Sequence, residues 1–167
     1  GAGLKDPFYI MEAIGETLPD AFSLLQAKLP RRLFTSHIRV VVLGEDLARA
    51  GIGPVFDSLT RIRELRISAD VIVTRGEASL LRAAPRLGRL PVSALSNILN
   101  QQIVPVRSIR EVAIALVSEG IDPFVPAVGL AQRIETELEA GVRAQEFELQ
   151  GVGIFRGDRL VGFAPLE

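Results

Sequence analysis

The sequence predicts an α+β fold in which helices pack on a mixed β-sheet and the chain ends in a β-meander. Residues 38–43 and 69–74 are apolar runs of strand length that enclose two short helical segments. Residues 108–118 have apolar positions at helical spacing and begin with a capping motif. From residue 124 onward the apolar positions follow a two-residue period, and a Gly-Asp turn comes near the C-terminal end.

Composition limits the classes of protein to which the chain can belong. It has 167 residues, of which 48% are hydrophobic, a net charge of −1 and no cysteine. The absence of cysteine excludes disulfides, thiolate metal sites and cysteine nucleophiles, and the near-neutral charge argues against a nucleic-acid partner. No run has the length of a membrane span, and no signal-peptide pattern opens the chain. We expect two small lobes, a helix-rich α/β lobe over about residues 1–104 and a helix with a β-meander over about residues 105–167.

The first third of the chain predicts a strand, a helix, a strand and two more helices. Residues 7–14 are apolar on both faces and favour a strand. A helix follows from Thr17, whose hydroxyl suits an N-cap, to about Leu29 before Pro30. After the strand over 38–43, a short helix over residues 45–50 precedes a second helix from Pro54 to about Arg66.

The middle third predicts a strand and three helices. After the strand over 69–74 come helices over residues 77–84 and 92–102. The third helix runs from a Ser108–Glu111 capping box to Ser118, with Gly120 placed as its C-terminal cap. Its predicted inward positions are Ile109, Val112, Ala113, Leu116 and Val117.

The last third predicts antiparallel strands. Residues 124–138 favour a strand, with a helix over residues 132–140 as the competing interpretation. A second strand returns over residues 143–155, Gly157-Asp158 forms a tight turn, and residues 159–163 form the last strand.

Four segments, taken in order, carry a family resemblance. They are HIRVVVLGEDLARAGI from His37, FDSLTRIRELR from Phe56, VIVTRGEA from Val71 and GVGIFRGDRLVGF from Gly151. Together they resemble the Ger(x)C family, the lipoprotein C subunit of the nutrient germinant receptors of bacterial spores. No single segment is a catalytic motif, so the resemblance depends on the ordered set.

The resemblance implies a place and a role. Residues 1–167 would be the N-terminal region of a lipoprotein that is lipid-anchored on the outer face of the spore inner membrane. The signal peptide, the lipid-modified cysteine, the first strands of the family pattern and a C-terminal domain are absent from this sequence. The family implies integral-membrane A and B subunits as partners, no cofactor and no nucleic acid. We therefore expect a non-enzymatic subunit that acts in receptor assembly and signalling, and the alternative is a nutrient-binding module of the same pathway.

Chemical candidates in the sequence are weak. His37 is the only histidine, so no histidine pair holds a metal, and a hydrolase would need it beside Ser36 or Ser58 and a carboxylate. We predict a structural role for His37. Gly151 and Gly153 lack the following helix of a phosphate-binding loop, and Arg156-Gly157-Asp158 favours a turn over an adhesion motif. We predict no catalytic, cofactor-binding or metal-binding residue.

One charged set is the predicted partner-contact surface. It comprises Asp57, Arg61, Glu64 and Arg66, all placed on the helix that begins near Pro54. Asp57 and Arg61 have the spacing of a helical ion pair, which stabilises a helix by about 0.3 kcal/mol. A solvated helix face with no partner is the competing interpretation.

Overall fold

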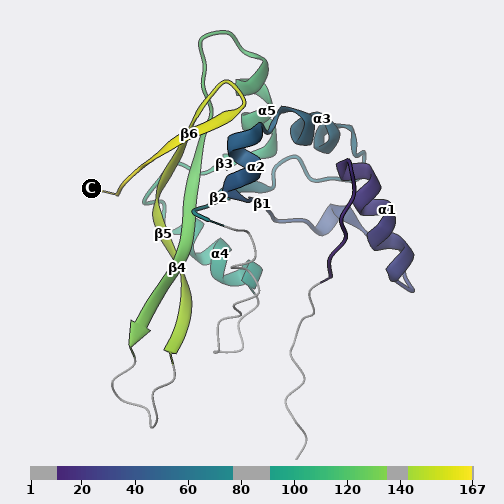
Figure 1. The fold of residues 1–167 in the computed structure, drawn as a ribbon, viewed down its shortest axis with the longest axis horizontal. Coiled ribbons are helices and arrows are strands. Elements are labelled where there is room, and N and C mark those ends of the chain that lie inside the picture. The colour runs from purple at the N-terminus through teal and green to yellow at the C-terminus, as the bar shows by residue number, and fades with distance from the viewer. Residues whose placement is uncertain (1–10, 77–90, 135–142, 167) are drawn as a thin grey trace, which may run out of the picture.

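A six-stranded mixed β-sheet with helices on both faces forms the centre of the molecule (Figure 1). A computed structural model describes residues 11–76, 91–134 and 143–166. The predicted α+β class is confirmed. The helices are α1 (Leu18–Lys28), α2 (Glu45–Ala50), α3 (Gly53–Arg61), α4 (Pro91–Asn100) and α5 (Ile109–Val117), with a 3-10 turn η1 (Thr35–His37). The strands are β1 (Val40–Leu43), β2 (Asp70–Thr74), β3 (Arg107–Ser108), β4 (Phe124–Ile134), β5 (Arg143–Arg156) and β6 (Arg159–Ala164).

The sheet joins a parallel part to an antiparallel part. Its order is β1-β2-β4-β5-β6, and β3 pairs with the start of β2. β1 runs parallel to β2, and β2 runs parallel to β4 through Val73 opposite Ala127. β4, β5 and β6 form the predicted antiparallel meander. Strands from both sides of residue 104 therefore share one sheet, and the division into two lobes stays a prediction.

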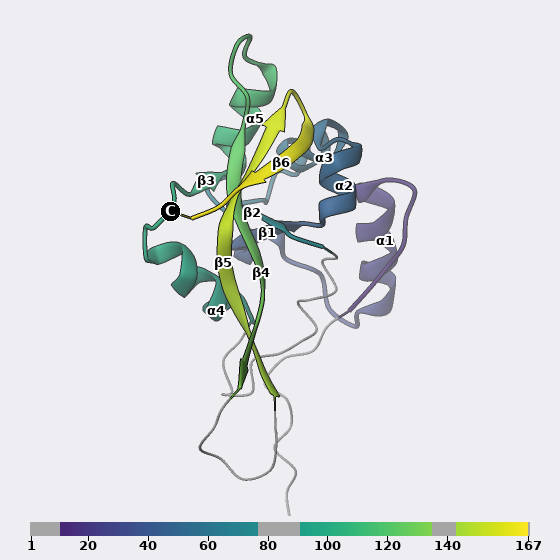
Figure 2. The ribbon, with the colours of Figure 1, turned by 60° about the vertical axis from the view of Figure 1, so that its left-hand side comes forward.

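Two apolar cores lie on opposite faces of this sheet. One contains Ile52, Phe56 and Ile109, so α2, α3 and α5 cover that face. The other contains Leu95 and Leu99, so α4 covers the second face. Figure 2 shows α4 on the other side of the strands from α2 and α3. Because both faces of β2 are covered, its Val71–Val73 segment is fully buried and has no polar alternation.

The helices of the first half begin where the sequence predicts, but one is shorter. Thr17 Oγ1 accepts a hydrogen bond from the Asp20 N–H at 3.3 Å, which confirms it as the N-cap of α1. α3 ends at Arg61, since Ile62 adopts an extended conformation. The predicted extension to Arg66 is wrong: a turn replaces it and brings buried Leu65 into the core ahead of β2.

Two predicted strands are shorter than expected or absent in the described residues. Residues 11–14 form no strand, and the remainder of the predicted strand over 7–14 lies outside the described residues. Residues 38 and 39 precede β1, because the η1 turn occupies the chain up to His37. The predicted helix over residues 77–84 also lies outside the described part of the chain.

The helix α5 begins at the predicted cap and ends differently. Ser108 Oγ accepts a hydrogen bond from the Glu111 N–H at 3.2 Å. The Glu111 carboxylate is bonded to Arg107 at 3.4 Å, so the reciprocal half of the predicted capping box is replaced by an ion pair. The C-cap is Ser118 in an extended conformation, so the prediction of Gly120 as the cap is wrong. Gly120 instead has a φ of 76° in the turn that follows.

The C-terminal strands agree with the sequence. β4 continues through residues 132–134, which contradicts the competing helix there, and residues 135–140 lie outside the described part. Gly157, with a φ of 59°, forms the predicted turn between β5 and β6. The turn is fixed to the helices, because the Ile52 N–H donates to the Asp158 carbonyl at 2.8 Å.

Candidate partner-contact surface

The structural role predicted for His37 stays a prediction. His37 is exposed at the end of η1. Among the described residues, no hydrogen bond joins it to Ser36, Ser58 or a carboxylate. The arrangement therefore lacks the orienting acid and the nucleophile that a hydrolase requires.

The glycines allow close packing of the strands, and the Asp of the Arg-Gly-Asp tripeptide hydrogen-bonds within the fold. A Cβ on Gly151 would meet the Ala164 carbonyl oxygen, and a Cβ on Gly153 would lie 2.6 Å from Val73 Cγ1. Asp158 Oδ2 accepts a hydrogen bond from the Gly53 N–H at 3.2 Å, at the first turn of α3. The side chain that an adhesion receptor would read is therefore used inside the fold.

The predicted charged set does not form one surface on one helix. Asp57 and Arg61 lie on α3 and form an ion pair at 3.3 Å. Glu64 lies in the turn after α3 and pairs with Arg32 at 3.2 Å, and Arg66 is exposed at the start of the next turn. All these side chains are largely solvated, and such pairs contribute between about 0 and 1 kcal/mol to stability. A role of this set in partner contact stays a prediction.

The helix α5 presents a second surface, which the sequence analysis did not single out. Ile114 is 51% exposed, Val117 is 85% exposed, and Ile121 in the following turn is 55% exposed. We call these three residues the α5 patch. Val117 was predicted to face inward, and this prediction is wrong. The sequence did contain a signal for this surface: the helix is apolar on more than one face. Such a helix has more apolar surface than a single contact with the core can bury.

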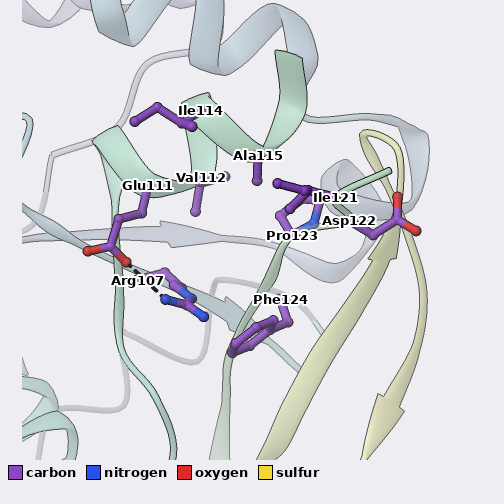
Figure 3. Close-up of a pocket in the computed structure, with 9 residues that line it drawn as sticks. All are labelled: Arg107, Glu111, Val112, Ile114, Ala115, Ile121, Asp122, Pro123 and Phe124. Carbon is purple, nitrogen blue, oxygen red and sulfur yellow. Dashed lines mark hydrogen bonds and ion pairs between the residues drawn. The ribbon is translucent and has the colours of Figure 1, made fainter. Parts of the chain in front are cut away.

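A shallow groove adjoins the α5 patch (Figure 3). It lies between α5 and the turn that leads into β4, and its volume is about 260 Å³. Ile121 points into it from the turn, and Phe124 forms the opposite wall. The Arg107 guanidinium lies 4.3 Å from the centre of the Phe124 ring while it pairs with Glu111. The groove is thus lined mainly by apolar side chains, together with one cation, Arg107, and two carboxylates, Glu111 and Asp122.

Two carboxylates elsewhere have shifted pKa values. The hydrogen bond from Arg49 lowers the pKa of Glu45, and the Gly76 N–H, 2.7 Å from Glu45 Oε2, acts in the same direction. Burial raises the pKa of Asp70, and the nearby charge of Glu111 adds to this. Glu45 joins α2 to the end of β2, so its network is a structural one. Among the described residues, no group of histidine and acidic side chains has the arrangement of a metal site.

Comparison with known families decides what kind of protein this is. A family model described as the spore germination protein N-terminal domain matches residues 1–130. The chain belongs to this family. The predicted membership in the Ger(x)C family is thereby confirmed, and the chain is one of the spore germination proteins.

Individual spore germination proteins match over much of the chain. "Putative spore germination protein YfkR" of Bacillus subtilis (strain 168) is 33% identical over 96% of this chain and 41% of its own length. Spore germination protein KC of the same organism is 26% identical over 75% of this chain and 33% of its own length. A crystal structure of the GerBC protein has a TM-score of 0.43 and 22% identity, over 87% of this chain and 39% of that chain. The chain therefore spans well under half the length of the relatives it matches.

Family membership agrees with the prediction that the chain is not an enzyme, since the family is one of germination proteins. Within the described residues, no helix is long and apolar enough to span a membrane. The features of this Ger(x)C chain that suit a function are therefore the α5 patch with its groove and the charged set around α3.

Proposed function

We propose that this chain is part of a non-enzymatic subunit of a spore germinant receptor, and that it acts in receptor assembly and signalling. The subunit would be held by a lipid anchor at the outer face of the spore inner membrane. Its partners would be the two integral-membrane subunits of the receptor. The family membership supports this role, and the α5 patch is the structural observation that carries it.

The α5 patch has the properties of a protein contact. Ile114, Val117 and Ile121 are all more than half exposed, and they lie on one helix and the turn directly after it. Apolar side chains gathered in this way favour burial against a partner, at about 25 cal/mol for each Å² removed from water. The adjoining groove would accept an apolar anchor side chain, which is the usual centre of a binding interface.

The experiment tests the α5 patch against the predicted charged set. The full-length protein is produced together with its two membrane subunits, and the amount of each subunit that co-purifies is measured. The double variant Ile114→Glu with Val117→Glu places charges in the proposed contact without touching a core position. We expect at least a tenfold loss of co-purification, together with a slower germination response of spores that carry the variant.

Two further variants serve as comparisons. Ser23→Glu adds a charge at an exposed position of α1 and should leave co-purification unchanged. Asp57→Lys with Arg61→Glu reverses the charged pair on α3, and should also have little effect if the α5 patch is the contact. Full co-purification of the α5 variant would overturn the proposal. Loss with the α3 variant alone would move the contact to the charged set.

The groove beside α5 favours one second candidate, a nutrient-binding module. A largely apolar hollow that is also lined by Arg107, Glu111 and Asp122 offers charges of both signs to a small zwitterion. Its volume of about 260 Å³ lies just below the range of about 300–1,000 Å³ found for most ligand pockets. Melting of the purified protein with amino acids and sugars tests this candidate: a reproducible rise in Tm that Arg107→Ala abolishes supports it, and a flat response contradicts it.

A further inference from the structure

The strand β5 has a long outer edge that its neighbour covers only in part. β5 runs from Arg143 to Arg156 and pairs with β4 along nearly all of this length. On its other side, β6 pairs only with the segment from Val152 to Arg156. In the described residues, the outer edge of residues 143–150 has no strand beside it. Figure 1 shows β4 and β5 continuing as a two-stranded ribbon beyond the end of β6.

The point at which β6 leaves β5 is fixed by the sequence. Gly151 has a φ of 136°, which favours glycine, and the Ala164 carbonyl oxygen lies where its Cβ would be. Pro165 follows Ala164 at once, and it has no N–H with which to continue the ladder. The open edge therefore begins at a defined residue and is not a frayed end of the β5–β6 pair.

The open edge is held in strand geometry before any partner arrives. Phe147 lies opposite Leu130, and Leu149 lies opposite Val128. Both Phe147 and Leu149 are buried in the core that includes α4. The backbone of β5 is already extended and packed. Binding of an added strand would therefore not have to offset an entropy cost of ordering β5.

The sequence protects this edge only in part. Natural edge strands carry lysine, proline or bulges that prevent pairing with other chains. Residues 143–150 contain neither lysine nor proline, and the one bulge lies at Gln150, between the pairs Ala127–Gly151 and Val128–Leu149. At about 3.3 Å per residue the open stretch is roughly 25 Å long, which is longer than the about 17–20 Å of a typical partner strand of five to six residues. Glu148 is exposed on this strand and favours a basic residue in the strand opposite.

We infer that the outer edge of residues 143–150 receives an extended segment of another protein of the germination assembly as an added β-strand, with a basic side chain near Glu148. Main-chain hydrogen bonds would supply the affinity, and the alternating side chains would supply the specificity. The inference rests on the proposed assembly role, but it uses a different element from the α5 patch.

The test is site-specific crosslinking in the assembled full-length protein. A photo-crosslinking amino acid replaces Glu148, and in a matched variant it replaces Arg156. Arg156 is exposed on the same strand, but there β6 already covers the edge. We expect a crosslink from position 148 to a second, different protein, and at least fivefold less product from position 156. Peptide mapping of the product should locate the crosslink in an extended segment that contains lysine or arginine.

A second pair of variants tests the charge. With the crosslinking residue at position 150, Glu148→Lys should reduce the product severalfold, whereas Glu148→Gln should reduce it less. A product within the same chain, a product with a second copy of the chain, or equal yields at positions 148 and 156 would overturn the inference. If the membrane subunits co-purify and no crosslink forms, the edge is not the contact and the assembly role stands. If no subunit co-purifies, both proposals fail.

Discussion

At the scale of single residues, Asp158 caps the N-terminus of α3. Its carboxylate accepts a hydrogen bond from the Gly53 N–H, and the residue before α3, Ile52, has no side chain that could cap the helix. A carboxylate at a helix N-terminus satisfies a free N–H and also favours the helix dipole. The hairpin turn thus provides a cap that the local sequence of α3 lacks.

We expect Asp158→Ala to lower the free energy of unfolding by about 1 kcal/mol, since a lost N-cap typically costs that amount. Urea denaturation followed by circular dichroism measures the change. Glu119→Ala removes an exposed acid after α5 and is the matched control, with an expected change below about 0.5 kcal/mol. Equal values for the two variants would show that Asp158 does not support α3.

At the scale of elements, different residues of α5 contribute to stability and to the proposed partner contact. Ile109 is fully buried against α3 and β2, whereas Ile114 on the same helix is half exposed. The sequence predicted this helix and its N-cap, because the Ser108 hydroxyl and the helical spacing are local signals. The exposure of Val117 is not local: it depends on which neighbours α5 meets, and spacing alone does not reveal them.

The same residue type at these two positions gives a direct comparison. Ile109→Ala should lower the free energy of unfolding by about 2–5 kcal/mol, because it leaves a cavity in the core. Ile114→Ala should change it by less than about 0.5 kcal/mol, because the side chain is solvated. Thermal or urea unfolding of the two variants measures both values. A large loss from Ile114→Ala would mean that the α5 patch is a folding element and not a contact surface.

At the scale of the whole molecule, the order of the strands in the sheet could not be predicted from the sequence. The strands over residues 69–74 and 124–138 were predicted from their apolar content, and the final hairpin from its Gly-Asp turn. Nothing in either strand indicates that Val73 lies opposite Ala127 in parallel. The charged set around α3 was likewise predicted from a helix that extends to Arg66, whereas α3 ends at Arg61 and Leu65 is buried in the turn beyond it.

A substitution at Gly153 tests this order of the strands. A methyl group there would lie 2.6 Å from Val73 Cγ1 and 3.2 Å from Leu160 Cδ1, so it would clash with side chains of β2 and β6 and force them to shift. We expect Gly153→Ala to lower the free energy of unfolding by about 1–3 kcal/mol, the usual cost of overpacking. Gly162→Ala on β6 meets nothing within 4 Å and is the control. Differential scanning calorimetry distinguishes the two, and similar Tm values would argue against this arrangement of the strands.

The hydrogen bond between the β5–β6 turn and the start of α3 also determines when the protein can finish folding. Asp158 lies 105 residues after Gly53, so during synthesis α3 leaves the ribosome long before its cap exists. Contacts so distant along the chain slow folding, because a large loop must close before they form. We expect nascent chains that end before the last hairpin to be cleaved readily by protease, and resistance to appear only once β6 has emerged.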